Sequence, residues 1–580
     1  MTDTHVSPEQ TNASPPAEAS SRRGFREWLR DRSKVETGMW LGLLVVAIVV
    51  RVLDLGDRPF HHDESQDAYF SYTFYKDFAS YEYNPLLHGP VRFYLTGLTY
   101  WIFDPTNFTA RLMPALMGVL AVGLPYLLRH QLGRVAAYAA AVALAIGPTY
   151  LYFSRFARED IYLAAITLAM IVAAFRFLRR PHPVTLCLFA ALIAVAFAIK
   201  ESGLVLAGIA GLYFIAAIVV QGLLARHRGG AFGDGEVASA LLKVRWTGWV
   251  YALATLVFVY TLLFTHLFTN FDCTTTASVG HPARETSCVN AVVYGLQYWT
   301  DQQDVARGDD SGWLYISILF GEEWPVLLLA IVGAIFTIRK PTTLRVFLVV
   351  FFAGVLGFHL WGTERFAWLA IHPLLPLILL AGVGVQALWE LRGRLPRLAA
   401  LGAVGVGALY MIIASFSANA VQRADPRSLL VSTQSSEQVA QVAEQVDALG
   451  DITVTVDSAE GATFPYAWYF RDKQIGYIDA TVDGYVPDTQ ALVLTENAYL
   501  KLKPNLAAYE CRRFDFRVWW VKDYDKKFSV GAWADWFTQR KAWNSTGGMQ
   551  ERFCLRRDVG PLPGKGTESE IPPPQPAPAA

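Results

Sequence analysis

Long uninterrupted apolar runs constrain the fold of this chain more than any other feature of its sequence. Hydrophobic residues make up 53% of the chain, while only 17% of its residues are charged. Each run is close to the length that an α-helix needs to cross a bilayer, which predicts a polytopic α-helical membrane protein with about eleven transmembrane helices. The predicted spans lie near residues 39–54, 109–128, 135–153, 161–178, 184–199, 203–222, 247–269, 314–338, 344–361, 366–388 and 398–417.

Basic residues between these runs predict which side of the membrane each loop faces. Short loops rich in Lys and Arg stay in the cytoplasm, and every second loop is basic when the N-terminus is placed inside. The short aromatic segment 90–103 then lies at the membrane interface, within an outer loop at 55–108. A second outer loop, 270–312, holds two arginines and six acidic residues. The basic residues of the predicted cytoplasmic loops are Arg129, Arg134, Arg176, Arg179, Arg180, Arg226, Arg228, Lys243, Arg245, Arg339, Lys340, Arg345, Arg392, Arg394 and Arg397.

Composition divides the chain into four parts, as expected of a multi-pass protein of the plasma membrane. Residues 1–38 are polar and basic, which predicts a disordered cytoplasmic N-terminus, and residues 39–420 form the transmembrane domain. Short strand and helix patterns over 421–560 predict an extracytoplasmic α/β domain. The Pro-rich residues 561–580 predict a disordered tail. Net charge is zero and no basic run is interleaved with aromatics, so nucleic acid is not expected as a partner.

The cysteines fit an oxidising outer face. Cys273 and Cys288 share an outer loop, Cys511 and Cys554 share the C-terminal domain, and Cys187 is alone within a span. Disulfides form and persist mainly outside the cytoplasm. We therefore expect one disulfide bond within each of the two outer pairs.

Acidic residues gather just after the first span. Asp63 and Glu64 lie in a loop that also holds His61, His62 and Asp67. A solvated outer loop would explain them equally well. Alternatively, a carboxylate near the bilayer surface can act as a general base toward an acceptor hydroxyl, or bind a hard divalent cation such as Mg²⁺ or Mn²⁺.

Three further charged clusters fall on the same predicted membrane face. Their members are Arg155, Arg158, Glu159 and Asp160; Lys200 and Glu201; and Glu364, Arg365, Trp368 and His372. Each has an ordinary explanation, since an acid can cap a helix and a lysine can extend to the interface. Together they favour a site for a phosphate-linked substrate, in which basic side chains neutralise the phosphate and a carboxylate activates the nucleophile. None lies at the predicted midplane, which favours interfacial chemistry over a central ion pathway.

Motifs of other chemistries are missing from the sequence. His61 and His62 are adjacent, so their side chains diverge, and no His-x-x-x-His or Cys-x-x-Cys spacing accompanies them. The chain also has no P-loop, GxSxG or HExxH pattern. A zinc site, ATP-driven transport and the common hydrolase chemistries are therefore not expected.

Several motifs, in one order along the chain, resemble a known family. The segments "HHDESQDAY", "LLHGPVRFYLTG", "FTARLMPALMGVL", "YFSRFARED" and "FAIKESG" resemble membrane GT-C glycosyltransferases of the protein O-mannosyltransferase and aminoarabinose-transferase type. The later "YWTDQQDVARG" and "TERFAWLAIHPLLPLILLAG" are similar to a subgroup described as archaeal flippase activity-associated proteins. The resemblance covers roughly residues 40–380.

The resemblance implies transfer of a sugar from a polyprenyl-phosphate donor to an acceptor at the outer membrane face, usually with inversion. It places the catalytic base on Asp63, with Glu64 beside it, and a second acid or metal ligand on Asp160. Cations that bind the phosphate would fall on Arg158, Lys200 and Arg365. The other residues expected to bind substrate are His62, His88, Arg155, Glu159, Glu201, Glu364, Trp368 and His372.

The sequence departs from the family pattern at two places. His88 and Pro90 stand where the family has a His-Pro-Pro turn, but Gly89 replaces the first proline. Near residue 365 a Lys-x-Pro-Trp pattern is replaced by Arg-Phe-Ala-Trp. The geometry of both segments therefore has to come from the structure.

The sequence thus predicts a GT-C-like membrane glycosyltransferase that contacts membrane lipid and a polyprenyl-phosphate sugar donor, and that acts on a protein, lipid or glycan. Asp63 and Asp160 could hold Mg²⁺ or Mn²⁺, although basic residues alone would suffice for a monophosphate leaving group. One alternative is a flippase or transporter for lipid-linked sugars, which would be expected to show an inverted repeat; none is evident. The other alternative is a non-catalytic component of a glycosylation complex.

Overall fold

A computed structural model of the chain describes residues 34–563, except 80, 85–86, 276–283, 305–306, 309–310 and 525–528. The disorder predicted for residues 1–33 and 564–580 falls outside the described residues. Residues 34–38, however, are helical, because the first helix, α2 (Lys34–Val52), begins before the predicted span.

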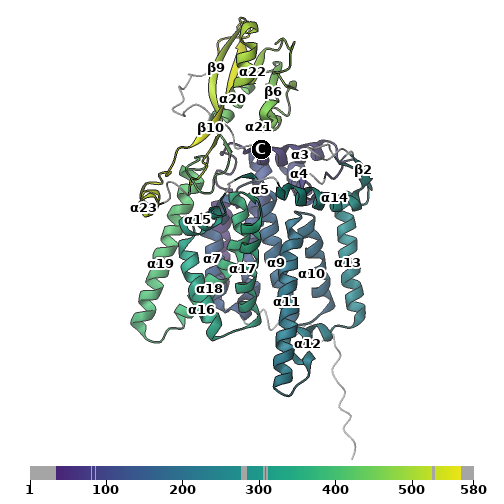
Figure 1. The fold of residues 1–580 in the computed structure, drawn as a ribbon, viewed down its shortest axis with the longest axis vertical. Coiled ribbons are helices and arrows are strands. Elements are labelled where there is room, and N and C mark those ends of the chain that lie inside the picture. Colours follow the sequence, from purple (N-terminus) through teal and green to yellow (C-terminus); the bar gives the residue numbers. More distant parts are fainter. Residues whose placement is uncertain are drawn as a thin grey trace, which may run out of the picture.

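Apolar helices that run side by side form the larger part of the molecule (Figure 1). In the described part of the chain, eight helices are long and apolar enough to cross a membrane, or ten if each of two bent pairs is one span. Each predicted run corresponds to a helix or a bent pair, although the number that cross the bilayer stays a prediction. The helices that correspond to the later predicted runs are α5 (Asn107–Gly123), α6 (Pro125–Leu132), α7 (Arg134–Ile146), α8 (Pro148–Ser154), α9 (Glu159–Arg179), α10 (Pro183–Phe197), α11 (Ser202–His227), α13 (Trp246–Phe264), α15 (Trp313–Gly321), α16 (Trp324–Arg339), α17 (Thr343–Trp361), α18 (Ile371–Trp389) and α19 (Arg394–Phe416).

Two predicted spans are sharply bent. α7 meets α8 at 58°, and α15 meets α16 at 96°. Pro148 opens α8, and a proline has no N–H with which to continue the preceding turns. Glu322 and Glu323 separate α15 from α16. Glu323 accepts a hydrogen bond from the Thr149 N–H at 3.0 Å, so the two bends are joined to each other.

α18 lies at the centre of the bundle. Its apolar window is completely buried, and it packs against α7, α16 and α17. Glycines permit this packing, because a Cβ on Gly384 would lie 2.0 Å from the Leu329 carbonyl oxygen, and one on Gly333 would lie 2.0 Å from that of Leu380. Small residues let membrane helices approach closely. The central helix is therefore held by backbone contacts as well as by apolar side chains.

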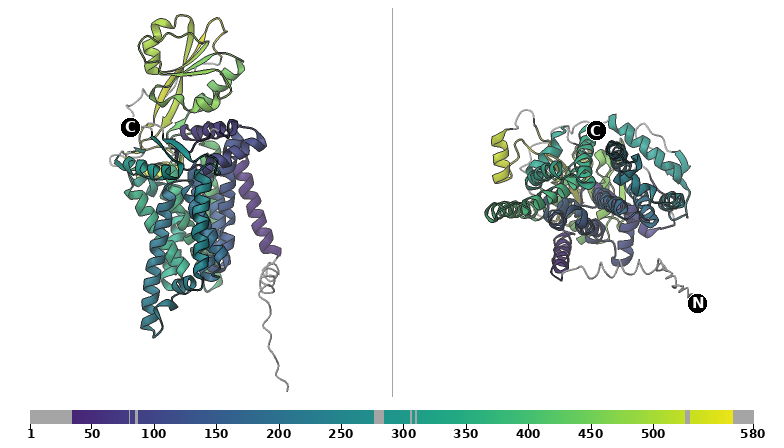
Figure 2. Two further views of the ribbon diagram at one scale, coloured as in Figure 1. Left: turned by 90° about the vertical axis from the view of Figure 1, so that its right-hand side faces the viewer. Right: turned by 90° about the horizontal axis from the view of Figure 1, so that it is seen from below.

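Three helices lie at one end of the bundle, beneath the C-terminal domain (Figures 1 and 2). They are α3 (His62–Lys76), α4 (Val91–Phe103) and α14 (Cys288–Asp301). With 13 residues, α4 is too short to cross a bilayer. Its Trp101, Ile102 and Phe103 side chains are exposed, as an interfacial helix requires. A disulfide bond between Cys273 and Cys288 ties the start of α14 to the preceding chain.

The C-terminal domain is a six-stranded mixed sheet with helices on both faces. The strand order is β5-β9-β10-β8-β6-β7, with β6 parallel to both of its neighbours and β10 antiparallel to both of its own. Cys511 and Cys554 are paired across β9 and β10 and are disulfide-bonded. The sequence did not predict β5 or β10. The elements are β5 (Gln434–Ser435), α20 (Glu437–Ala448), β6 (Val454–Asp457), α21 (Thr463–Tyr469), β7 (Ile475–Ile478), β8 (Ala491–Thr495), α22 (Glu496–Leu502), β9 (Tyr509–Trp519), α23 (Val530–Gln539) and β10 (Gly547–Arg556).

This domain is docked on the residues around α3. The Tyr469 hydroxyl accepts a hydrogen bond from the Phe60 N–H at 3.0 Å. Trp468 donates from Nε1 to Asn107 Oδ1 at 2.9 Å. Among the described residues, the far end of the bundle carries short connections and α12 (Glu236–Leu242), as Figure 1 shows. The two ends of the bundle therefore differ strongly, although which end faces the cytoplasm stays a prediction.

Candidate active site

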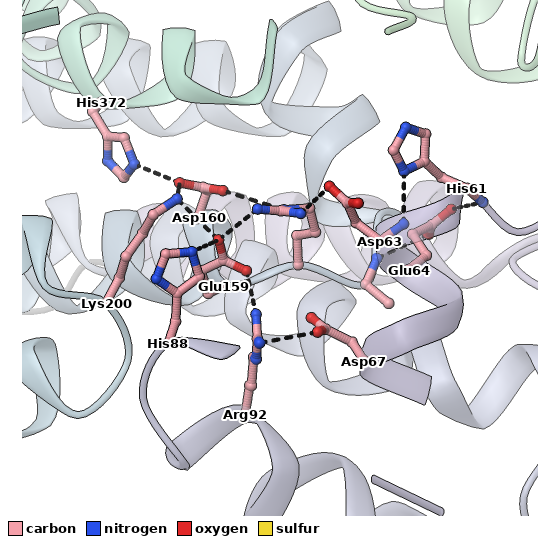
Figure 3. A network of polar contacts seen from close by, with 12 residues as sticks. His61, Asp63, Glu64, Asp67, His88, Arg92, Glu159, Asp160, Lys200 and His372 are labelled. Atoms are coloured by element: carbon pink, nitrogen blue, oxygen red, sulfur yellow. Dashed lines mark hydrogen bonds and ion pairs between the residues drawn. The ribbon is translucent and has the colours of Figure 1, made fainter. Parts of the chain in front are cut away.

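The start of α3 is fixed by a reciprocal cap. His61 precedes the helix, and its Nδ1 accepts a hydrogen bond from the Asp63 N–H at 3.0 Å. Glu64 in turn accepts one from the His61 N–H at 3.2 Å. This is a capping box with histidine in the usual place of serine or threonine. It holds Asp63 in the first turn, where its carboxylate pairs with Arg158 (Figure 3).

Glu64 is completely buried between two arginines. Its carboxylate lies 3.1 Å from Arg58 Nη2 and 2.9 Å from Arg111 Nε, and it accepts a hydrogen bond from the Ala157 N–H at 2.9 Å. Burial would raise the pKa of Glu64, but Arg111 and Arg58 outweigh it and lower the pKa to about 2. Because both oxygens are occupied, we infer a structural role for Glu64 in place of the catalytic one expected beside Asp63.

The start of α9 supplies the centre of the site. Arg158 precedes the helix, and Glu159 and Asp160 form its first turn. Arg158 pairs with Asp63, donates to Glu159 at 2.9 Å, and places its Nε 3.9 Å from Asp160 Oδ2. Acidic side chains are favourable at a helix N-terminus. The Arg158 guanidinium therefore joins the start of α9 to α3.

Lys200 completes this centre from the loop between α10 and α11. Its Nζ lies 2.9 Å from Glu159 Oε1 and 2.9 Å from Asp160 Oδ1 (Figure 3). Burial would lower the pKa of Lys200, but Asp160 and Glu159 outweigh it and raise the pKa. His372, from α18, lies 3.1 Å from Asp160 Oδ1 through Nε2. One network thus joins six of the predicted residues, namely Asp63, Arg158, Glu159, Asp160, Lys200 and His372.

Gly89 sets the distance between the turn before α4 and the Lys200 loop. Its N–H donates to the Ile199 carbonyl at 3.2 Å. A Cβ at this position would lie 2.0 Å from the Ala198 carbonyl oxygen, so only glycine fits. This contact explains why the chain departs here from the His-Pro-Pro pattern.

The same turn brings His88 into the site. His88 Nδ1 lies 2.7 Å from Glu201, and Nε2 lies 3.6 Å from Glu159. Its ring stacks on Trp299 of α14, with ring centroids 4.2 Å apart. The outer loop that carries α14 therefore also borders the site.

Arg92 and Asp67 belong to the network, although the sequence did not single them out as site residues. Arg92 pairs with Glu159, and its Nη2 lies 3.1 Å from Asp67 Oδ1. Asp67 lies one helical turn after Asp63, so both face the same side of α3. Burial raises the pKa of Asp67 to about 8 despite the attraction of Arg92. Burial would also raise the pKa of Asp63, but Arg158 outweighs it and lowers the pKa to about 2.

Two more predicted residues border the network. The Arg158 guanidinium lies 4.6 Å from the centre of the Trp368 ring. His62 accepts through Nδ1 a hydrogen bond from Arg517 at 2.8 Å. Because Arg517 lies on β9, the C-terminal domain reaches to within one residue of Asp63.

Three further predicted substrate-binding residues make contacts outside the network, although Glu364 lies close enough to Lys200 to raise its pKa. Arg155 donates to the carbonyl oxygens of Val50 at 2.9 Å and Leu53 at 2.6 Å, near the end of α2. In this structure its donors satisfy a helix end, and a role for Arg155 in substrate binding stays a prediction. Glu364 and Arg365 form the short strand β4, which pairs with β3 (Arg307–Gly308) of the outer loop. They connect that loop to the bundle.

A signal for the missed residues was present in the sequence. Arg111 interrupts the predicted span 109–128, and Arg92 interrupts the apolar segment 90–103. A charged side chain within an apolar membrane segment usually has a partner. Asp67 and His61 carried no such signal, because they lie in a polar loop.

A divalent ion shared by Asp63 and Asp160 does not fit this arrangement. Arg158 contacts both carboxylates and occupies the position that a shared cation would need. The described residues contain no group of three or more His, Cys, Asp or Glu side chains placed to hold a metal ion. Arg158 and Lys200 can supply the positive charge instead, and a requirement for Mg²⁺ or Mn²⁺ stays an untested prediction.

Comparisons with known proteins agree with this architecture. Residues 87–228 match the family described as dolichyl-phosphate-mannose-protein mannosyltransferase. ArnT from Cupriavidus metallidurans, solved with bound undecaprenyl phosphate, is similar with a TM-score of 0.56 at 16% identity, over 91% of this chain and 100% of that chain. Apo ArnT gives the same values. The apo oligosaccharyltransferase of Archaeoglobus fulgidus has a TM-score of 0.48 at 12% identity, over 75% of this chain and 59% of that chain. The curated proteins gave no match.

The chain is therefore a multi-pass membrane protein whose fold is similar to that of ArnT, and its residues 87–228 match the mannosyltransferase family model. The family match covers the region that carries Arg158, Glu159, Asp160 and Lys200. The finer likeness to the archaeal flippase-associated subgroup stays a prediction.

Proposed function

We propose that this protein transfers a sugar from a polyprenyl-phosphate donor to a hydroxyl group of a protein, lipid or glycan at the extracytoplasmic face. The network that joins Asp63 to Arg158, Glu159, Asp160 and Lys200 at one end of the bundle is the observation that carries this proposal. The similarity to ArnT bound to undecaprenyl phosphate supports the lipid part of the donor.

The proposed step is a single displacement at the anomeric carbon. The acceptor hydroxyl attacks this carbon while Asp63 takes up its proton, and the bond between the carbon and the phosphate oxygen breaks. Polyprenyl phosphate leaves with the electron pair of that bond. Attack opposite the phosphate inverts the configuration of the sugar.

Arg158 and Lys200 are the cations proposed to stabilise the leaving phosphate. In this structure Arg158 pairs with Asp63. A donor phosphate would compete with Asp63 for the guanidinium, because both are anions. Binding of the donor would thereby free Asp63 and raise its basicity, so that the base becomes active when the donor is present.

The test is mass spectrometry of polyprenyl-phosphate sugars and glycosylated products in membranes that contain equal amounts of the native chain or Asp63→Asn. We expect donor to accumulate and product to disappear in the variant. Asp57→Asn is a matched control in the same loop, because its side chain is 57% exposed and lies 3.8 Å from Arg423, outside the network. Unchanged pools in Asp63→Asn would favour a transporter or a non-catalytic component instead.

A further inference from the structure

Four buried polar atoms on Arg158 and on residues in or beside the network have no hydrogen-bond partner among the described residues. They are His61 Nε2, Trp368 Nε1, Arg158 Nε and Asp160 Oδ2. The His61 residue is 4% exposed, and the Trp368 residue is 2% exposed. Native proteins leave few buried polar groups unpaired, because each one has lost its hydrogen bonds to water without replacement. Arg158 Nε and Asp160 Oδ2 at least face each other at 3.9 Å, so the unpaired N–H groups of the two neighbouring rings, His61 and Trp368, are the feature that a bound molecule would explain.

His61 can act there only as a donor. Its Nδ1 accepts the hydrogen bond from the Asp63 N–H, so the ring proton is on Nε2. Burial lowers the pKa of His61 to about 4, which keeps the ring neutral at physiological pH. The cap of α3 therefore fixes both the tautomer and the orientation of the ring.

The Trp368 ring is nearly perpendicular to the His61 ring. Phe366 stacks on its ring at 4.4 Å between centroids, and the Arg158 guanidinium lies 4.6 Å from the ring centre. The His61 ring lies 5.8 Å away at an interplanar angle of 77°. Neighbours thus fix the ring, and the indole N–H is the group left to bind a ligand.

The four atoms combine donors with an acceptor. His61, Trp368 and Arg158 offer N–H groups, whereas Asp160 Oδ2 accepts. An ionised phosphate only accepts hydrogen bonds, but a hydroxyl group both donates and accepts. This combination of donors and an acceptor therefore fits sugar hydroxyls better than a phosphate. Lys200 remains the better partner for the phosphate.

We propose that His61 Nε2–H and Trp368 Nε1–H bind hydroxyl groups of the sugar on the lipid-linked donor, and that Asp160 Oδ2 accepts a hydrogen bond from one of them. This inference rests on the proposed function and adds how the sugar itself is recognised. His61 is two residues from Asp63, and Trp368 contacts Arg158. A sugar held here would lie beside the base and beside Arg158, one of the phosphate-binding cations.

Two substitutions remove the N–H groups and keep the surrounding structure. Trp368→Phe keeps an aromatic ring beside Arg158 and Phe366. His61→Ser keeps the cap, because serine followed three residues later by Glu64 is the usual capping box. Trp536→Phe is the matched control, since Trp536 is also completely buried with an unpaired indole N–H but lies on α23.

The experiment measures the affinity of the full chain in nanodiscs for undecaprenol, undecaprenyl phosphate, and undecaprenyl phosphate carrying mannose, glucose, galactose or arabinose. With the sugar that the native chain binds best, each site variant should bind about 3- to 10-fold more weakly. Its affinity for bare undecaprenyl phosphate should stay unchanged. Trp536→Phe should match the native chain for every lipid.

Equal weakening for the bare and the sugar-bearing lipid would overturn the proposal, because the two residues would then bind phosphate. Unchanged affinities in both variants, or a native chain that binds no sugar-bearing lipid more tightly than the bare phosphate, would overturn it as well. Results that contradict the proposed function itself would be different from these. In that case the native chain binds undecaprenyl phosphate no better than undecaprenol, or Asp63→Asn leaves product formation intact.

Discussion

Asp63 and Glu64 show how adjacent carboxylates acquire different roles. Successive residues of a helix point about 100° apart, so Asp63 faces Arg158 while Glu64 faces Arg111. The Asp63 side chain is 24% exposed, whereas that of Glu64 is 0% exposed. An acceptor hydroxyl can therefore reach Asp63, and Glu64 holds the helix on which Asp63 stands.

Glu64→Gln should lower the free energy of unfolding by about 3–5 kcal/mol, because Arg58 and Arg111 would keep their charges without a buried counter-ion. Unfolding of the purified protein in detergent, followed by circular dichroism, measures this loss. Asp63→Asn is the comparison, since Arg158 keeps Glu159 as a partner. An equal loss of stability in the two variants would contradict the structural role of Glu64.

The pH dependence of stability should also reflect Glu64. Its pKa is about 2 in the folded protein and near 4.5 when unperturbed. A lowered folded-state pKa stabilises the protein above the unfolded pKa, and this stabilisation is lost as the pH falls from 4.5 toward 2. Melting temperatures across this range should fall more steeply for the native chain than for Glu64→Gln. Parallel curves would argue against the ion pairs.

At the residue scale, the sequence predicted which charged residues belong to the network better than it predicted which residues each of them contacts. The sequence predicted four of these residues because each one follows or precedes an apolar run at the same predicted membrane face. They are Asp63, Arg158, Asp160 and Lys200. Which carboxylate is exposed depends on the rotation of α3, which a polar loop sequence does not reveal. The C-terminal Arg517 was also beyond prediction, because it reaches His62 only through the docking of a distant domain.

At the element scale, the turn before α4 controls the spacing of the site. Gly89 touches the backbone beside Lys200 on one side and positions His88 on the other. A change of backbone spacing here moves Lys200 relative to Arg92 and Glu159. The turn therefore sets the geometry of several charged groups at once.

Gly89→Ala should reduce transfer on the order of 10- to 100-fold, because its methyl group must displace the Ala198 carbonyl and small misplacements of catalytic groups are costly. Initial rates in membranes with equal protein content provide the measurement. Gly208→Ala, on α11, is the control, since a Cβ there would meet nothing within 4 Å. Equal rates in both variants would show that the close approach is unimportant for the reaction.

The positions of the apolar runs were predictable, but their bends were less so. Pro148 signals the break between α7 and α8 in the sequence, whereas the break at Glu322 and Glu323 depends on a partner from another helix. Strand β10 was missed because its residues alternate only weakly between apolar and polar. Each of these features depends on contacts that are distant along the chain.

At the scale of the whole molecule, the site and the C-terminal domain share one end of the bundle, and α12 lies at the other (Figure 1). The distribution of basic loops predicts that the domain faces outward. The orientation of the whole chain thus decides where the reaction occurs.

A membrane-impermeant maleimide should label Ala448→Cys in intact spheroplasts and Ala231→Cys only after permeabilisation. Both residues are exposed, at the end of α20 and just before α12. The native chain, whose Cys187 lies within α10, reports background labelling. The reverse pattern would place the site on the cytoplasmic face.

The contact between Phe60 and Tyr469 also affects how the protein is assembled during synthesis, because 409 residues separate the two along the chain. At about 5–20 residues per second, a ribosome needs about 20–80 s to travel from one to the other. Throughout that interval the segment before Asp63 is already made, yet the domain that braces it does not exist. A chain that terminates before Tyr469 would therefore carry the charged network without the domain that braces the segment before Asp63.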